Sequence, residues 1–426
     1  MRRLIYIFII GLLLCSYTWA DGSRYASKSL LSEGKWVKIR VDKTGIYKLS
    51  YADLKNMGFS DPSKVSVHGY GGWPLDEDFS KEYIDDVPST PVWRGSDYLL
   101  FYGKGPVKWE YDSSSQTFVH TNNPYSLYGY YFVTDATPTN DMTSVAQASG
   151  ASTRITTYDD YLLHEQELVS VNQSGREFFG EDFSGARPRT ISTFSSIPGI
   201  TDADGKVTMR FISRINSGSG TASLSINDSE LLDITIPSIQ TVSSNVRSYT
   251  KAIPGTTTAL WKGSESEKNN VVVSYSSSGH TNVRLDYIRM QFVRTLRPYG
   301  ACTFFRSLTS VGNASRFVIS EANSNTLVFD VTDALNVKRV EADLNGSELS
   351  FTIPAGRLRE FVLVQTNQTF PSPEVVGEVA SSNLHGLEQR DMIIISAPSL
   401  VQQAERLAVA HREKDGLTVE VVTPEA

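Results

Sequence analysis

The sequence predicts a mainly β protein whose last residues begin a parallel α/β domain. Aromatic residues are plentiful, with 20 Tyr and 19 Phe, and Ser, Thr, Asn and Gly crowd the middle of the chain, which favours strands joined by turns. Many short apolar runs are separated by Gly, Pro, Asn or Asp. Only near the C-terminus does a long helical period lie between two β-branched runs. The length of 426 residues allows roughly two to four domains.

Residues 1–20 have the three parts of an export signal: two arginines, an apolar run, and a small residue before Asp21. The apolar run is short for a membrane span, so we interpret residues 1–20 as a cleavable signal peptide, with a retained anchor as the alternative. Cys15 follows Leu14, a bulky residue where a lipoprotein peptidase requires a small one, which disfavours lipidation. We therefore expect an exported protein that is soluble outside the inner membrane.

The net charge disfavours a nucleic-acid-binding protein, and the cysteine content excludes a protein held together by disulfides. The formal net charge is −7 and gives no basic surface on average, so nucleic acid is not an expected partner. Apart from Cys15 only Cys302 remains, so no intramolecular disulfide can form in the exported chain. Cys302 lies in a predicted strand and is interpreted as a small buried apolar residue. A nucleophilic role would require a histidine close to it in space.

Residues 21–145 are predicted to form an N-terminal β-rich domain. Residues 36–41 and 46–49 alternate apolar and polar side chains on either side of a turn at 43–45, which predicts a hairpin with one wet face. Ser50 and Asp53 have capping-box spacing and predict a short helix over 51–57, ended by Gly58. Further strands are predicted over 65–68, 97–102, 107–111 and 128–133.

Residues 146–375 are predicted to form a β-sandwich-like domain of two packed sheets. A Thr/Ser/Ala/Asn-rich spacer over 136–157 is read as a linker or long loop, and a proline-containing join at 370–373 follows the domain. The predicted strands in this region are 207–212, 222–226, 270–275, 282–288, 315–319, 326–330 and 361–364.

Residues 376–426 are predicted to start an α/β domain. Asp391–Ser396 is a short apolar run typical of a strand buried on both faces, and Leu417–Val422 is a second such run. Between them a helix is expected to begin at Pro398-Ser399, with Ser399 and Gln402 as a capping box, and to end at Gly416 in a left-handed cap. Its apolar face is made by Leu400, Ala404, Leu407, Ala408 and His411.

Strand, helix and strand in this order predict a right-handed crossover. One crossover does not cover both faces of a sheet, so we expect a domain that begins here and continues past the chain, with Leu400, Leu407 and His411 partly uncovered. Ligands of open α/β sheets bind beyond the carboxyl ends of the strands, so residues after Ser396 and Val422 are expected to edge a site.

Acidic residues crowd one loop region of the predicted N-terminal domain. Solvated surface is the simplest reading of this cluster, and a calcium site or a pair of glycosidase carboxylates are the alternatives. Asp202-Ala-Asp204-Gly205 resembles part of a calcium loop but lacks its later oxygen donors, so a turn between strands is predicted. The carboxylates of the cluster are Asp76, Glu77, Asp78, Glu82, Asp85 and Asp86.

No residue qualifies as catalytic, cofactor-binding or metal-ligating from the pattern of this chain. The six histidines are scattered without metal-ligand spacing, and the glycines at 69–72 and 103–105 are not followed by the Lys-Ser/Thr of a phosphate loop. His411 is interpreted as a helix-packing or partner-facing residue. No cofactor is therefore required, and calcium is possible but unsupported.

Several separated segments resemble type IX secretion system sortases of Bacteroidetes. They occur in the family's order, and the likeness extends through most of 35–426, weakest across about 185–360. The quoted segments are Trp36-Val-Lys-Ile-Arg-Val-Asp-Lys-Thr-Gly-Ile-Tyr-Lys-Leu49, Val67-His-Gly-Tyr-Gly-Gly72, Asp97-Tyr-Leu-Leu-Phe-Tyr-Gly-Lys-Gly-Pro106, Tyr125-Ser-Leu-Tyr-Gly-Tyr-Tyr-Phe132, Ser174-Gly-Arg-Glu-Phe-Phe-Gly-Glu181, and Asn383-Leu-His-Gly386 through Val422.

The resemblance implies a surface-attached cysteine peptidase with a caspase-like, gingipain-like α/β fold. Such sortases remove C-terminal signal domains from secreted cargo and join the cargo to anionic lipopolysaccharide, working with outer-membrane partner proteins. Their chemistry needs a thiolate activated by a histidine. The family's catalytic His and Cys come from later strands, and neither Cys302 nor His385 matches them. The implied enzyme is therefore represented by its N-terminal portion alone, and this chain is expected to be inactive.

A second function from a different class is a self-contained surface adhesion or glycan-binding β protein. It would use exposed aromatic residues such as Trp73, Trp93 and Trp109. The alternative for these tryptophans is core packing, because large aromatic side chains dominate cores.

Overall fold

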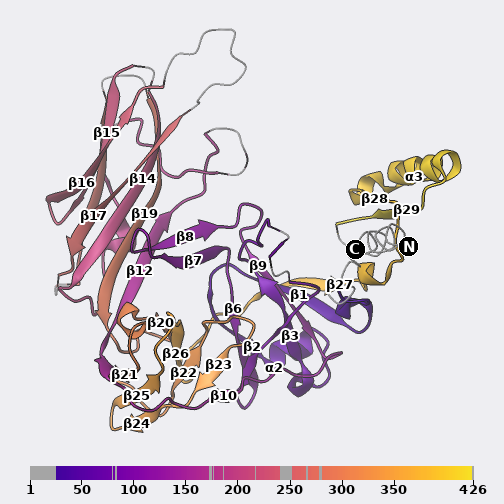
Figure 1. The fold of residues 1–426 in the computed structure, drawn as a ribbon, viewed down its shortest axis with the longest axis horizontal. Helices are drawn as coiled ribbons and strands as arrows, with labels where there is room; N and C mark the ends of the chain where they lie inside the picture. The colour runs from indigo at the N-terminus through magenta and orange to yellow at the C-terminus, as the bar shows by residue number, and fades with distance from the viewer. Residues whose placement is uncertain are drawn as a thin grey trace, which may run out of the picture.

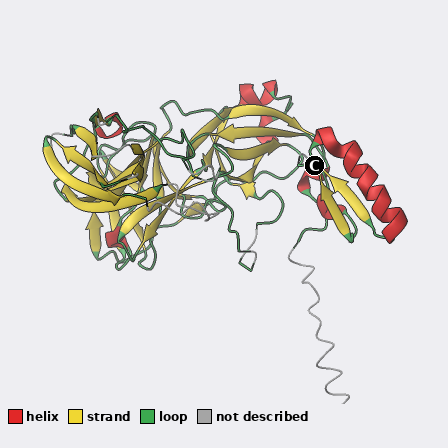
Figure 2. Ribbon diagram, turned by 90° about the horizontal axis from the view of Figure 1, so that it is seen from above, coloured by secondary structure: helices red, strands yellow, loops and turns green. Residues whose placement is uncertain are grey.

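The computed structural model describes residues 25–424 except 79, 82–83, 172–174, 176, 186, 216, 240–251, 265–266 and 278–280, so the predicted signal peptide lies outside the described residues. Strands dominate the described part, which confirms the mainly β fold class (Figures 1 and 2). Its two α-helices are α2 (Tyr51–Asn56) and α3 (Val401–Asp415). Among these residues no helix is both long and apolar enough to cross a membrane.

The N-terminal part consists of a five-stranded and a three-stranded sheet packed face to face. Apolar side chains from both sheets, such as Ile39, Val133, Leu49 and Phe101, fill the layer between them. The strand order of the larger sheet is β27 (Glu374–Val379), β1 (Trp36–Val41), β9 (Gly129–Thr134), β3 (Ser66–Gly71) and β4 (Ser89–Thr90). That of the smaller sheet is β2 (Gly45–Ser50), β6 (Tyr98–Gly103) and β5 (Val92–Arg94).

The predicted hairpin over 36–49 is wrong. β1 pairs with β9 and β27, whereas β2 pairs with β6, so the turn at 43–45 carries the chain from one sheet into the other. Each strand pairs with a strand distant in sequence because this pairing buries its apolar residues in the shared core, as Ile39 (0% exposed) and Leu49 (1% exposed) show. The polar residues of the predicted wet face are only partly exposed in both strands.

The short helix α2 forms as predicted. Asp53 N donates to Ser50 Oγ (3.0 Å) and Ser50 N donates to Asp53 Oδ2 (3.3 Å), which completes the capping box. Gly58 follows with φ 92°, a left-handed conformation that glycine adopts without strain. Leu54 is fully buried and fixes the helix against the N-terminal core.

Residues 136–157 are mostly loop, as one of the two predicted alternatives has it, but they are not a linker because two short strands in them pair with sheets. β10 (Ser144–Val145) pairs in parallel with β23, and β11 (Thr153–Ile155) pairs in parallel with β21, so this segment joins two sheets of a second sandwich. These sheets have the orders β10, β23 (Lys338–Val340), β22 (Thr326–Asp330), β26 (Phe361–Gln365), β20 (Cys302–Phe305), and β11, β21 (Ser315–Ile319), β25 (Glu348–Ile353), β24 (Asp343–Asn345).

The N-terminal sheets and the second sandwich make a stack of four β layers. Ile46 and Leu100 of the three-stranded sheet pack against Phe329 and Val362 of the sheet that contains β20, and a further core rich in phenylalanine lies beyond it. Figure 1 shows these layers in sequence along the lower part of the molecule.

The remaining strands of the middle region form a tall sandwich of two four-stranded sheets. The region predicted as one pair of sheets therefore contains two pairs, because its sequence separates into two apolar cores. The sheet orders are β12 (Thr157–Glu165), β19 (Thr281–Thr295), β14 (Asp204–Ile215), β17 (Ile253–Lys262), and β13 (Arg189–Thr190), β18 (Val271–Ser277), β15 (Ser219–Ile226), β16 (Ser229–Pro237).

A hairpin of β7 (Val107–Asp112) and β8 (Thr117–Asn122) reaches from the N-terminal sheets onto the tall sandwich (Figure 1). Phe118 and Gln291 exchange two hydrogen bonds, from Phe118 N to Gln291 Oε1 (2.9 Å) and from Gln291 Nε2 to Phe118 O (3.2 Å). Lys206 Nζ donates to the carbonyl oxygens of Ser115 and Gln116 in the tip of the hairpin. The hairpin thus connects sheets that are far apart in sequence.

The predicted strand–helix–strand unit is confirmed. β28 (Met392–Ile395) and β29 (Val419–Val422) pair in parallel on either side of α3, and Gly416 ends the helix with φ 68°. Figure 2 shows this unit projecting from the β layers. The helix face is partly uncovered as expected, with Leu400 55% and Leu407 51% exposed while Ala408 is buried.

Two details of this unit differ from the prediction. β28 is not buried on both faces, since Ile393 is 59% and Ile395 74% exposed, because described residues cover only the face that carries the helix. The capping box of Ser399 and Gln402 does not form, because Pro398–Leu400 makes a 3-10 turn and α3 begins at Val401 without a side-chain cap.

Candidate functional site

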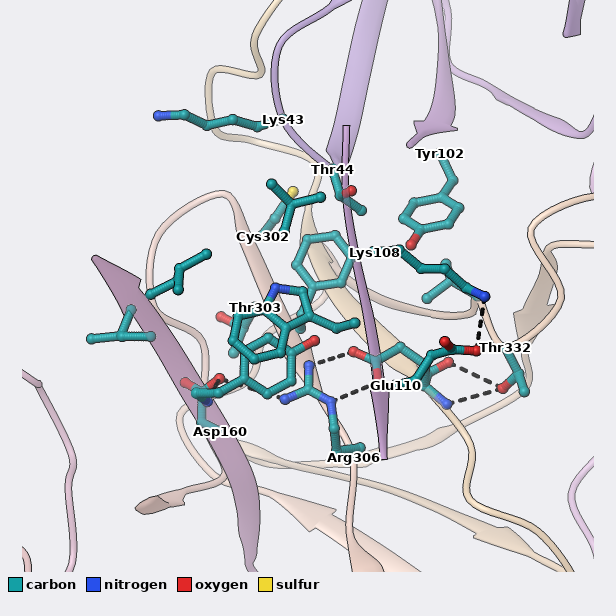
Figure 3. A pocket seen from close by; sticks show the side chains of 18 of the residues that line it. Lys43, Thr44, Tyr102, Lys108, Glu110, Asp160, Cys302, Thr303, Arg306 and Thr332 are labelled. Carbon is teal, nitrogen blue, oxygen red and sulfur yellow. Dashed lines mark hydrogen bonds and ion pairs between the residues drawn. The ribbon is translucent and has the colours of Figure 1, made fainter. Parts of the chain in front are cut away.

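A cavity of about 710 Å³ lies where the β7–β8 hairpin meets the second sandwich and the start of β12. Its walls come from widely separated parts of the chain: the turn at 42–44, Trp73, Tyr102, the hairpin, β12 with the end of β19, β20, and residues 331–332 and 358–360. Figure 3 shows Thr44, Cys302, Thr303 and Arg306 around this space. Long-range folding, rather than any local motif, assembles the site.

Aromatic side chains form much of the wall. The Trp109 ring stacks on Tyr161, with ring centroids 3.9 Å apart and planes 18° from parallel. Trp109 is half-buried, and both it and Tyr161 line the cavity. Trp73 also lines the cavity, and Tyr102 and Phe304 form a tilted ring pair beside it.

A buried ion cluster forms the floor. Arg306, 1% exposed, donates through Nε to Glu360 Oε2 (2.6 Å), through Nη2 to Glu360 Oε1, and through Nη1 to the Asp159 carbonyl (2.9 Å). Its guanidinium lies 4.3 Å from the centre of the Tyr161 ring. Asp160 accepts a hydrogen bond from Arg294 Nη1 (2.9 Å) and lies 3.5 Å from Arg306 Nη1. Burial raises the pKa of Glu360, and the Arg306 guanidinium opposes that rise.

The cysteine in the cavity wall is held as a neutral thiol. Burial raises the pKa of the Cys302 thiol to about 12, so the thiol stays protonated at neutral pH. None of the residues that line the cavity is a histidine. Cys302 packs at the edge of the apolar layer between the N-terminal and second-sandwich sheets, in agreement with its interpretation as a small apolar residue.

The described carboxylates of the acidic loop are held by hydrogen bonds and an ion pair. Asp76 accepts from Asp78 N (3.0 Å) and pairs with Lys81 Nζ (2.6 Å), and Asp78 accepts from Ser80. Glu82 lies outside the described residues. Within the described chain no group of three or more His, Cys, Asp or Glu is placed to hold a metal ion. Asp202 and Ala203 form a bend, and Asp204 and Gly205 are the first residues of β14, so the predicted turn covers only the first half of this segment.

Asp85 and Asp86 bind the segment that precedes β1. Asp86 accepts from Ser29 Oγ (2.8 Å) and Leu30 N (2.7 Å), and Asp85 accepts from Ala26 N (2.5 Å). These contacts, together with those that residues 382–385 make with Ser29, Leu31 and Asp85, are called the N-terminal latch. Sequence reasoning missed it because the partners are more than 50 residues apart.

The latch also includes the residues that lead to the α/β unit. Ser29 N donates to Asn383 Oδ1 (2.9 Å), Ser382 N donates to the Leu31 carbonyl (3.1 Å), and His385 Nε2 lies 3.6 Å from Asp85 Oδ1. Three segments, at 26–31, 85–86 and 382–385, therefore meet at one point.

We expect Asp86→Gly to open the latch. Asp86 has φ 53°, so glycine removes the carboxylate without straining the backbone. Two hydrogen bonds to a charged group are lost, and trypsin should cut after Lys28 about tenfold faster in limited proteolysis. Asp76→Gly, whose bonds stay within its own loop, is the control and should leave that rate unchanged. Equal cutting rates in the Asp86 variant and the native chain would contradict the latch.

The histidines are dispersed among separate contacts. His68 is buried between Thr137 Oγ1 (2.8 Å) and the Val87 carbonyl, and burial lowers the pKa of its ring. His120 pairs with Glu165, His164 with Glu181, and His411 with Asp415. His280 lies outside the described residues. No two of the described histidines contact a common carboxylate.

A polar cluster that sequence reasoning missed lies where the hairpin meets the tall sandwich. Asp286 is 4% exposed and pairs with Arg210, while His120 Nε2 lies 3.3 Å from Glu165 Oε2. Burial raises the pKa of Asp286 to about 6, with Arg210 opposing and Glu165 adding to the rise. In the sequence, Asp286 is a polar residue in an alternating strand pattern. Such a pattern does not show whether the polar face of the strand is buried or exposed to solvent.

This pKa shift predicts a pH dependence of stability. Because the folded-state pKa of Asp286 lies above the ordinary 3.8, its contribution to stability is full below about pH 4 and is lost as pH rises through about 6. Urea unfolding at pH 4, 5, 6 and 7 should show this loss in the native chain and not in Asp286→Asn. Asp204→Asn, at an exposed strand end, is the control. Parallel stability curves for the native chain and Asp286→Asn would contradict the shift.

The three tryptophans proposed for adhesion do not share a surface. Trp73 and Trp109 line the cavity, whereas Trp93 packs against Tyr98, with ring centroids 5.8 Å apart, outside it.

The sequence also predicted that residues after Ser396 and Val422 edge a site in the strand–helix–strand unit. The carboxyl ends of β28 and β29 lie side by side, and Ser396 N donates to the Val422 carbonyl (2.9 Å).

The stacked β layers and the tall sandwich make a mainly β structure that leads into a parallel strand–helix–strand unit. The crystal structure of dimeric latent PorU from Porphyromonas gingivalis matches this arrangement with a TM-score of 0.84 and 35% sequence identity, over 94% of this chain and 38% of that chain. The fold is therefore PorU-like, and the chain spans 38% of the length of the PorU chain that it matches.

The other comparisons add nothing to this assignment. Insecticidal delta-endotoxin Cry8Ea1 from Bacillus thuringiensis aligns with a TM-score of 0.18 and 11% identity, over 53% of this chain and 42% of that chain, which is too weak to bear on fold or function. No protein-family model and no curated protein sequence matches the chain.

Proposed function

We propose that this chain is the front, non-catalytic portion of a type IX secretion system sortase. The observation that carries the proposal is the PorU-like fold, with 35% identity over 94% of this chain. The separate sequence motifs described above support the same family. On this proposal the protein works at the cell surface, with an exported chain associated with the outer membrane.

In this reading the β layers hold a gingipain-like cysteine peptidase in place. β27, the last strand before the α/β unit, pairs with β1 in the N-terminal sheet, and the latch ties residues 382–385 to the same region. The substrates would be secreted cargo proteins with C-terminal signal domains, and the acceptor would be anionic lipopolysaccharide. Outer-membrane proteins of the secretion system would be partners.

The exposed face of β28 supports a larger parallel sheet. Parallel sheets are covered on both faces, and the apolar side chains of Ile393 and Ile395 are mostly exposed here. The thiolate and the histidine of the peptidase would come from strands that follow this unit in the family. In the described chain the only cysteine is Cys302, a thiol held protonated by burial, so the purified chain is expected to cleave no cargo.

Deleting the encoding gene in a bacterium that carries it tests the proposal. We expect secreted cargo to keep its C-terminal signal domain and to lose its attachment to lipopolysaccharide, both measured by mass spectrometry of the surface fraction. The reintroduced gene should restore both. Normal removal of the signal domains in the deletion strain would exclude a sortase role.

A further inference from the structure

We propose that the cavity between the β7–β8 hairpin and the second sandwich binds a neutral oligosaccharide. This inference goes beyond the proposed function, because it concerns the β scaffold and not the peptidase. It rests on the size of the cavity, on the aromatic ring faces in its walls, and on the pairing of its charges.

The size of the cavity suits a small ligand. Its volume of about 710 Å³ lies within the range of roughly 300–1,000 Å³ that is typical of ligand sites, and such sites occur preferentially between domains. The wall is shared by the hairpin, β12 and β20, which are anchored to three different sheets. A ligand in the cavity would therefore contact several rigid elements at once.

The aromatic wall offers flat apolar surfaces of the size of a sugar ring. Trp109 is stacked on Tyr161, and both side chains line the cavity. Because the stack orders the indole before any ligand arrives, little side-chain entropy is lost on binding. The C–H face of a pyranose packs well on such a ring and leaves its hydroxyl groups at the rim.

The buried charges of the wall are paired, which favours a ligand without net charge, whereas Asp42 and Lys43 lie on the exposed turn. Arg306 is paired with Glu360, Asp160 with Arg294, and Arg359 with Asp330. An ionic ligand that broke one of these pairs would leave a buried charge uncompensated, which is strongly unfavourable.

Hydrogen-bonding groups remain available at the rim. Lys108 Nζ and Glu110 Oε1 are 2.8 Å apart, with the Glu110 side chain 60% exposed, and Figure 3 shows the two side chains meeting at the edge of the cavity. The carboxylate and the ammonium can together accept and donate hydrogen bonds to sugar hydroxyls. A cationic peptide would instead require unpaired carboxylates deep in the wall, and the carboxylates there are paired.

Titration calorimetry on the mature full chain with neutral linear hexaoses of glucose, mannose and N-acetylglucosamine tests the proposal. We expect at least one hexaose to bind with a Kd below about 1 mM and to quench tryptophan fluorescence. Trp109→Ala and Glu110→Ala should each weaken that binding about tenfold. Trp93→Ala, which removes an aromatic ring outside the cavity, is the matched control and should keep the native affinity.

Folding is checked by circular dichroism for every variant. Glu110 is an exposed residue, so Glu110→Ala keeps the test valid if Trp109→Ala fails to fold. Absence of binding by all three hexaoses, or binding that Glu110→Ala leaves unchanged, would overturn the proposal. Displacement of a bound hexaose by a lysine-rich peptide would also overturn it, in favour of a peptide site. None of these outcomes depends on peptidase activity, so they are distinct from a failure of the sortase proposal.

Discussion

Replacing Arg306 by alanine is expected to lower the free energy of unfolding by about 3–5 kcal/mol, because it removes a fully buried guanidinium and leaves the largely buried Glu360 carboxylate, 27% exposed, without its partner. Glu360 receives two hydrogen bonds from the Arg306 guanidinium, and both groups lie in the floor of the cavity. The change also removes the donor to the Asp159 carbonyl. Urea unfolding monitored by tryptophan fluorescence measures the loss.

The control and the rescue separate burial of charge from loss of an ion pair. Arg297 pairs with Glu321 on the surface, where the glutamate side chain is 63% exposed, so Arg297→Ala should cost no more than about 1 kcal/mol. The double variant Arg306→Met/Glu360→Leu replaces the pair by apolar residues of similar volume and should recover most of the lost stability. A loss in Arg306→Ala as small as that in Arg297→Ala would contradict a buried, uncompensated charge.

Truncating Phe305 to alanine is expected to destabilise the second sandwich by about 3–5 kcal/mol. Phe305 is 0% exposed and touches the rings of Phe317 and Phe361, at 5.7 and 5.3 Å between centroids. Removing it leaves a cavity that these rings, fixed on paired strands, do not refill. Thermal unfolding by differential scanning calorimetry reports the change.

A surface truncation on the same sandwich provides the comparison. Leu344 is 42% exposed in β24, so Leu344→Ala should change the free energy of unfolding by less than about 0.5 kcal/mol. If Phe305→Ala were as mild as Leu344→Ala, the phenylalanine cluster would not be the core of this sandwich.

Strand positions were predictable because alternation and turn residues are local. Ser315–Ile319 and Thr326–Asp330 were placed at the residues where β21 and β22 occur, and the capping box at Ser50 was placed correctly. Strand partners were not predictable, since the partner of a strand is set by which apolar faces meet in the folded chain. The prediction of a hairpin over 36–49 was wrong for this reason, since one of the two strands that pair with β1 lies at 374–379.

The candidate site was outside the reach of sequence reasoning for a related reason. Its walls combine residues from 42 to 360, and no segment carries a motif of its own. Trp73 and Trp109 were singled out as exposed aromatic residues, and the structure brings both to the cavity, but Trp93 was indistinguishable from them in sequence. Arg306 gave no signal, because a single arginine after a strand is ordinarily a surface residue.

The pairing of β1 with β27 has a mechanical consequence. Trp36 at the start of β1 lies opposite Val379 at the end of β27, so a pull between the two flanking segments would peel this ladder one hydrogen bond at a time. The latch joins those same flanking segments, through Leu31 with Ser382 and Ser29 with Asn383. A force that pulls on the α/β unit would therefore act on the latch contacts before it acts on Trp36 and Val379, the outermost pair of the ladder.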